Sequence, residues 1–182
     1  SLCERAGPGT ESTGDITAIF NVLVAGSDMD EPIADTLRGV LDGHVVLDRA
    51  IAERGRFPAI DILRSVSRSL PEALGEYENM LIGQARRLMG LYTRSETMIK
   101  AGLYTQGHDP ELDQAIAIWP DLDQFLAGTG GLSSVQDFKK LSMSLRKVGA
   151  LPHSQIDRAQ NPAPPEVAQL ETGLTRSGEN GA

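Results

Sequence analysis

The sequence has one cysteine, few aromatic residues and no long apolar run. Cys3 has no second cysteine with which to form a disulfide, and no charged segment followed by an apolar one opens the sequence, so nothing indicates secretion. The apolar runs are far shorter than the roughly 20 residues of a membrane-spanning helix. We therefore expect a cytoplasmic location, with peripheral membrane association at most. Because aromatic residues make up only 4% of the chain, aliphatic side chains must build the core.

Basic clusters are also lacking. The 17 Lys and Arg residues are outnumbered by 25 Asp and Glu residues, which gives a net charge of -8. Adjacent basic residues occur only as Arg86-Arg87, Lys139-Lys140 and Arg146-Lys147. Nucleic acid binding requires a surface that neutralises phosphates, so we do not expect nucleic acid as a partner.

Motifs for self-contained catalysis are absent from the sequence. It has no Gly-Lys dipeptide, and therefore no loop that cradles phosphates and sets a lysine on the terminal phosphate. It has no Gly-x-Ser-x-Gly motif, and His44, His108 and His153 are not at metal-ligand spacing. We expect no metal site, and no ATP binding or hydrolysis by this chain alone.

The first 70 residues alternate between strand and helix patterns. Residues 16–24 are apolar at both parities and rich in β-branched side chains, which predicts a strand buried on both faces of a covered, parallel sheet. Asp30 and Pro32 then open a helix that ends at Gly43. Two further strands are expected at 44–47 and from residue 60, separated by a short helix capped by Asp48. This order predicts an α/β unit.

The pattern changes after residue 70. Apolar residues at helical spacing predict one long helix over 74–92. Asp109 opens a second helix, which Pro120 is expected to break, and a capping box of Ser133 and Gln136 precedes a third, which Gly149 ends. We therefore divide the chain into an α/β part, 1–70, an all-α part, 71–150, and a tail, 151–182, whose Pro, Gly, Ser and Glu content predicts disorder.

Six segments follow one another in an order and spacing that suggest a known family: ERAG, GDITAI, DEPIAD, LDGHVVLDR, FPAID and SVSRSLP. They resemble the end of the nucleotide-binding domain of the rotary and type III export ATPases. LYTQGHDPELDQAI, further on, is similar to the helical C-terminal domain of the flagellar export ATPase. The resemblance covers about residues 1–127 and implies the C-terminal part of a RecA-like P-loop domain followed by a helical domain. FLAGTGG departs from the Phe-Leu-x-Gln pattern usual in the family.

The resemblance also implies a function for the intact protein. It would be a homohexamer that binds ATP and Mg²⁺ between subunits and hydrolyses ATP to drive flagellar protein export. Its expected partners are a coiled-coil stalk, other export-apparatus proteins, export substrates and chaperones. The phosphate loop, the magnesium-binding strand and the catalytic glutamate belong to an upstream half that this chain lacks. Two alternatives stay open: a virulence-type secretion ATPase or proton-ATPase subunit, and a non-enzymatic helical adaptor that binds export partners.

Two residues carry the expected nucleotide chemistry. In the family, the arginine corresponding to Arg68 resembles a finger that acts in trans on a neighbour's terminal phosphate, where its planar charged fork suits the transition state. The alternative for Arg68 is a surface salt bridge. Phe57 stands where family members commonly have Tyr against the adenine ring, and it keeps the π-face. The alternative for Phe57 is a core position.

Other residues have plainer interpretations. Asp28, Asp30 and Glu31 form an acidic turn that reads either as a solvated loop before a helix or, by the resemblance, as a contact with the central stalk. Asp61 is expected to hold its own loop by accepting backbone hydrogen bonds. Three more residues are expected to be turn and cap residues: Tyr104, Gly107 and Asp109.

Overall fold

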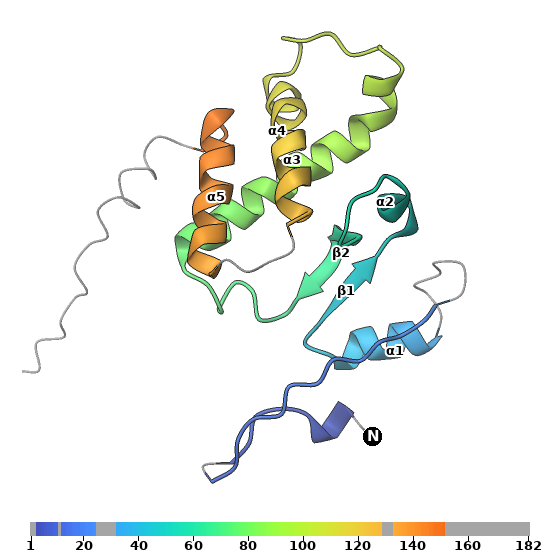
Figure 1. Cartoon of the computed structure of the whole chain (residues 1–182), viewed down its shortest axis with the longest axis vertical. Helices are drawn as coiled ribbons and strands as arrows, with labels where there is room; N and C mark the ends of the chain where they lie inside the picture. Colours follow the sequence, from blue (N-terminus) through green and yellow to red (C-terminus); the bar gives the residue numbers. More distant parts are fainter. Residues whose placement is uncertain (1–2, 11, 25–31, 129–132, 152–182) are drawn as a thin grey trace, which may run out of the picture. The chain divides into compact units, whose positions relative to one another are not determined.

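The computed structural model describes residues 3–10, 12–24, 32–128 and 133–151 (Figure 1). The acidic turn with Asp28, Asp30 and Glu31 lies outside these residues, as do residues 152–182 of the predicted tail. Leu151, the first residue of that predicted tail, is instead buried in the hydrophobic core. The elements are η1 (Cys3–Arg5), α1 (Pro32–Val40), β1 (Gly43–Leu47), α2 (Arg49–Glu53), β2 (Ile60–Ser67), α3 (Glu76–Lys100), α4 (Pro110–Leu126) and α5 (Ser134–Lys147).

The alternation of helix and strand between α1 and β2 is confirmed, but the sheet is antiparallel rather than parallel. Strands β1 and β2 form a two-stranded sheet in which Gly43 pairs with Ser67 and Leu47 with Ile60. Helix α2 between them has five residues and is about 7.5 Å long, too short to carry the chain back along the strand. The connection therefore returns β2 directly alongside β1.

The predicted strand at 16–24 is wrong. Only Ile16 pairs, in an isolated antiparallel bridge with Gly7, and Ile19 and Leu23 are 94% and 92% exposed. A strand buried on both faces needs neighbouring strands and covering layers, and the described residues supply neither beside this segment. Its β-branched composition alone does not create a sheet.

Helices α3, α4 and α5 pack around the main hydrophobic core. Leu81 and Leu88 of α3, Ile118 of α4 and Leu145 of α5 are fully buried there. The ring of Tyr92 stacks on that of Trp119 with a centroid distance of 4.1 Å, which adds a contact between α3 and α4. Among the described residues, no helix is long and apolar enough to cross a bilayer.

The local helix signals are confirmed, with one exception. Asp109 accepts hydrogen bonds from the backbone of Glu111 at the start of α4, Ser133 and the third residue after it form the capping box of α5, and Gly149 follows α5 with a φ of 65°. The expected break at Pro120 is wrong, because this residue lies inside α4. Proline removes one intrahelical hydrogen bond, but the buried residues on either side of Pro120 keep α4 on the core.

Candidate functional site

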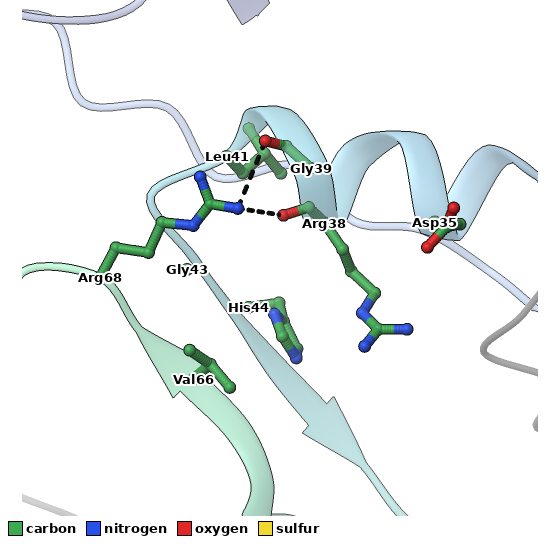
Figure 2. Close-up of a pocket in the computed structure, with 8 residues that line it drawn as sticks. All are labelled: Asp35, Arg38, Gly39, Leu41, Gly43, His44, Val66 and Arg68. Atoms are coloured by element: carbon green, nitrogen blue, oxygen red, sulfur yellow. Dashed lines mark hydrogen bonds between the residues drawn. The ribbon is translucent and has the colours of Figure 1, made fainter.

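Arg68 directly follows β2 and contacts the end of α1 (Figure 2). Its backbone N donates to the Asp42 carbonyl at 2.7 Å. Its guanidinium Nη2 donates to the carbonyls of Arg38 at 3.0 Å and Gly39 at 3.3 Å. Carbonyls in the last turn of a helix lack intrahelical partners, and a cation there is favoured by the helix dipole. Arg68 is exposed and, in the part of the chain that the structure describes, pairs with no carboxylate, so its partners are carbonyls and the alternative of a surface salt bridge is not found.

Arg68 lines a surface pocket of about 370 Å³. The pocket lies between the last turn of α1, the start of β1 and the end of β2, and Figure 2 shows the side chains of Arg68 and Arg38 on either side of His44. Asp35 supplies its one carboxylate. Two guanidinium groups against one carboxylate make this edge of the sheet attractive to an anion. The full lining is Asp35, Arg38, Gly39, Leu41, Gly43, His44, Val66 and Arg68.

Phe57 lies in the loop between α2 and β2 and is 62% exposed. The alternative of a core phenylalanine is therefore wrong for the described structure. The residue before it, Arg56, is only 8% exposed, so the two neighbouring side chains occupy opposite environments. An exposed aromatic ring on a loop whose neighbouring residue is buried is a suitable platform on which a flat ligand can stack.

Phe57 and Arg68 lie beyond opposite ends of the same strand. The ends of β2 pair with the ends of the shorter strand β1, Ile60 with Leu47 and Ser67 with Gly43, so they lie about 13 Å apart, the length of four residues of β1. The structure therefore does not bring the two predicted site residues together at one point within a chain. Residues so placed can serve two different ligands, one at each end of the strand.

A long bulge in β2 separates the two paired ends of the strand. The register changes between His44 and Val46, so Ile62 to Ser65 loop out of the ladder. Asp61 Oδ1 accepts from the backbone N of Leu63 at 3.0 Å and of Arg64 at 3.2 Å, which confirms its expected structural role. The Ser65 hydroxyl donates to the Asp61 carbonyl at 2.6 Å and accepts from the Val46 backbone N at 3.0 Å. Bulges change the direction in which the side chains next to them point.

Arg86 of α3 holds the bulge from the helical side. Its Nη1 donates to the Ile62 carbonyl at 2.7 Å and lies 3.4 Å from the Ser65 carbonyl, and its Nη2 donates to the Leu63 carbonyl at 3.2 Å. Three carbonyls that the distorted ladder leaves unpaired thus share one guanidinium. This role does not follow from the basic pair that Arg86 forms with Arg87 in the sequence. The available signal was its position beside Ala85, on the core-facing side of the long helix.

The tip between α3 and α4 is built from the predicted turn and cap residues. Gly107 has a φ of 88°, which only glycine adopts readily, and its N donates to Asp113 Oδ2 at 2.8 Å. The Tyr104 hydroxyl donates to Asp113 Oδ1 at 2.8 Å, and burial together with this hydrogen bond raises the pKa of Tyr104. These contacts confirm a structural role for Tyr104, Gly107 and Asp109. Within the residues described, no group of His, Cys, Asp and Glu could hold a metal ion.

The chain matches two family models in succession. The model described as "ATP synthase alpha/beta family, nucleotide-binding domain" matches residues 1–67, and the model described as "T3SS EscN ATPase C-terminal domain" matches residues 76–131. The chain belongs to the family of the flagellar and type III secretion ATPases. Its sheet and the helices that follow are consistent with part of the family's nucleotide-binding domain and its helical C-terminal part. Arg68 is the first residue after the first match.

Individual relatives support the same assignment. The chain is 48% identical over 131 residues to the "Flagellum-specific ATP synthase" of Caulobacter vibrioides, covering 69% of this chain and 30% of that protein. It is 46% identical over 125 residues to the "SPI-2 type 3 secretion system ATPase" of Salmonella typhimurium, covering 69% and 28%.

A solved structure of the assembled ATPase EscN with its central stalk EscO, from enteropathogenic E. coli, matches with a TM-score of 0.65 and 39% identity. This match covers 81% of the chain and 34% of that structure's chain. The chain thus spans about 30% of the length of the curated relatives it matches.

Proposed function

We propose that this chain is part of a longer ATPase that couples ATP hydrolysis to flagellar type III protein export. The observation that carries the proposal is the succession of the two family matches, one of a nucleotide-binding domain and one of a secretion-ATPase C-terminal domain. The flagellum-specific name of the Caulobacter relative favours the flagellar system. In this proposal the intact protein works in the cytoplasm.

The described residues fit the two ends of ATP. Phe57 offers an exposed aromatic face for the adenine, and the Arg68 guanidinium, held by two carbonyls of α1, offers charge to a phosphate. Bound Mg²⁺ would offset charge on the phosphate oxygens, and we assign it to no residue of this chain. The lysine of a phosphate loop would come from the rest of the protein, since the chain has no Gly-Lys dipeptide.

We infer a homohexamer in which each nucleotide lies between two subunits. The placement of Phe57 and Arg68 beyond opposite ends of β2 is compatible with this arrangement, in which one chain contributes to two nucleotides. Phe57 would stack on the adenine of its own subunit's nucleotide. Arg68 would reach the terminal phosphate bound by the neighbour and stabilise the charge that spreads over its oxygens in the transition state.

The proposed partners follow from the same family. EscN has been solved assembled with its central stalk EscO, which supports a coiled-coil stalk as a partner of this protein as well. Asp28, Asp30 and Glu31 remain the predicted stalk contact, and they lie outside the described residues. Export substrates, chaperones and other export-apparatus proteins complete the proposed set.

A virulence-type secretion ATPase is the nearest alternative. The identity to the Salmonella SPI-2 ATPase, 46%, is close to the 48% identity to the flagellar relative. The export phenotype separates them. Deleting the gene should abolish secretion of flagellar subunits and motility, and supplying it in trans should restore both. Normal flagella together with lost effector secretion would assign the protein to the virulence system instead.

A non-enzymatic helical adaptor is the alternative of another class. The reading frame upstream of residue 1 distinguishes this adaptor from the proposed ATPase. A Gly-Lys-Ser/Thr loop there, together with MgATP hydrolysis by the purified longer protein, is the expected result. A purified native protein without such a loop and without hydrolysis would contradict the ATPase and favour the adaptor.

A further inference from the structure

The loop that carries Phe57 is attached to the helices by two arginines. Arg56 Nε lies 3.1 Å from Asp123 Oδ1 of α4, and Arg54 Nη1 lies 3.6 Å from Glu96 Oε1 of α3. Both arginines directly precede Phe57 in the sequence, and their partners belong to two different helices. The position of this loop is therefore tied to α3 and α4 as well as to the strand that follows it.

Arg56 is an unusual residue for a purely structural contact. Its side chain is 7% exposed, its Nη2 donates to the Ile60 carbonyl at 3.0 Å, and its Nη1 is buried with no hydrogen-bond partner. The Nε lies close enough to Asp123 for an ion pair but is not aligned for a hydrogen bond. A buried cation with an unsatisfied donor costs stability, and an apolar side chain of similar volume would often pack at least as well. The contact between Arg56 and Asp123 is therefore better explained by the loop that it holds in place than by a gain in stability.

Arg56 holds both sides of the Phe57 loop. The Ile60 carbonyl belongs to the first residue of β2, and Asp123 belongs to the last turn of α4. A guanidinium that connects these points fixes the backbone immediately before Phe57, and the exposed ring then projects from a fixed base. A shift of α4 relative to the sheet would move the ring.

We propose that Arg56, through its contact with Asp123, is a positioning residue that sets Phe57 for adenine stacking and couples the helical part to nucleotide affinity. The inference rests on the proposed function, because it requires that Phe57 stacks on the base. Arg56 and Asp123 touch no nucleotide in this account. Their effect is on the base alone and passes through Phe57.

The test compares a nucleotide with a ligand that has no base. In the full-length ATPase, Asp123→Asn keeps the size of a side chain that is 43% exposed, so the variant should fold while losing the ion pair. We expect MgATP to bind about three- to tenfold more weakly, a part of the full stacking contribution, and magnesium tripolyphosphate to bind as in the wild type. Arg56→Lys, which keeps the charge and loses the fork, should show the same selectivity.

A double-mutant cycle and a matched control complete the test. In a Phe57→Ala background, Asp123→Asn should have no further effect on MgATP affinity, because the ring through which it acts is gone. Glu111→Gln, another acid-to-amide change on α4, removes an ion pair with Arg87 that does not touch the loop, and it should leave both affinities unchanged.

Three results would overturn the inference: unchanged MgATP affinity in Asp123→Asn, equal losses for both ligands, or the same loss with and without Phe57. The wild-type protein tests the proposed function separately. If it neither binds nor hydrolyses MgATP, the ATPase assignment fails and the inference fails with it. If it does both, the variants decide on the positioning role alone.

Discussion

At the scale of single residues, substitutions of the exposed Phe57 should affect nucleotide affinity but not the stability of the fold. Because the side chain is 62% exposed, Phe57→Ala should change stability little. In the full-length protein we expect this variant to weaken nucleotide binding by roughly 1 to 3 kcal/mol, whereas Phe57→Tyr keeps the π-face and should be nearly silent. Titration with ATP measures the affinity, and thermal unfolding serves as the control. A large drop in melting temperature with unchanged affinity would show that the ring supports the fold instead.

Arg68 has two roles that a conservative substitution can separate. Arg68→Ala in the full-length enzyme should still assemble and bind ATP but lose about three orders of magnitude in kcat. Loss of its bonds to the carbonyls of Arg38 and Gly39 should cost about 0.5 to 1 kcal/mol of folding free energy.

Arg68→Lys provides the comparison. A lysine can still donate to the end of α1, but its compact ammonium lacks the fork that spans two phosphoryl oxygens. The lysine variant should therefore recover stability and not turnover, measured by denaturant unfolding and steady-state hydrolysis. Recovery of both would mean that Arg68 acts only as a helix cap.

At the scale of elements, the bulge in β2 depends on Arg86. Arg86→Met keeps most of the apolar stem but removes the guanidinium from the carbonyls of Ile62, Leu63 and Ser65. Leaving part-buried carbonyls unpaired should lower the free energy of unfolding by about 2 to 3 kcal/mol. Urea denaturation measures this difference.

Arg87→Met is the matched control for the bulge. Arg87 is the next residue on α3, 63% exposed at its side chain, and pairs with Glu111. An exposed pair contributes about 0 to 1 kcal/mol, so this variant should unfold almost like the wild type. Equal losses in the two variants would show that the carbonyl contacts of Arg86 do not stabilise the bulge.

The elements also show how far the sequence predicts this fold. The caps of α4 and α5, the short helix after Asp48 and the strand before it follow from signals within a few residues, and the structure confirms them. The strand at 16–24 and the break at Pro120 depend on what packs against them, which local patterns do not contain. The same holds for the contacts of Arg56 and Arg86, because each joins segments that lie far apart in the sequence.

For the candidate site, the sequence supplied residue types and the structure supplied their arrangement. A family resemblance singles out Phe57 and Arg68, whereas the pocket beside Arg68 and the separation of the two residues by β2 follow only from the structure. Their roles in nucleotide chemistry stay predictions. His44 reaches the pocket through the pairing of β1 with β2, and Arg38 through the contact of Arg68 with the last turn of α1.

At the scale of the whole molecule, this chain should depend on the rest of the protein for nucleotide binding. It has no Gly-Lys dipeptide, and its described residues hold no metal-binding group, so the isolated 182-residue chain should show no ATPase activity and no tight ATP binding. A nucleotide titration of the isolated chain measures this. Micromolar affinity would contradict the claim that tight ATP binding needs residues from the rest of the protein.

The central claim is that Arg68 acts across a subunit interface, and a mixing experiment tests it most directly. Arg68→Ala subunits would be combined with subunits in which the phosphate-loop lysine of the longer protein is replaced, each inactive alone. Mixed hexamers contain interfaces where one subunit supplies the arginine and its neighbour the lysine. We expect these mixtures to regain part of the ATP hydrolysis of the wild type. Mixed hexamers that demonstrably form and remain as inactive as either parent would contradict the account.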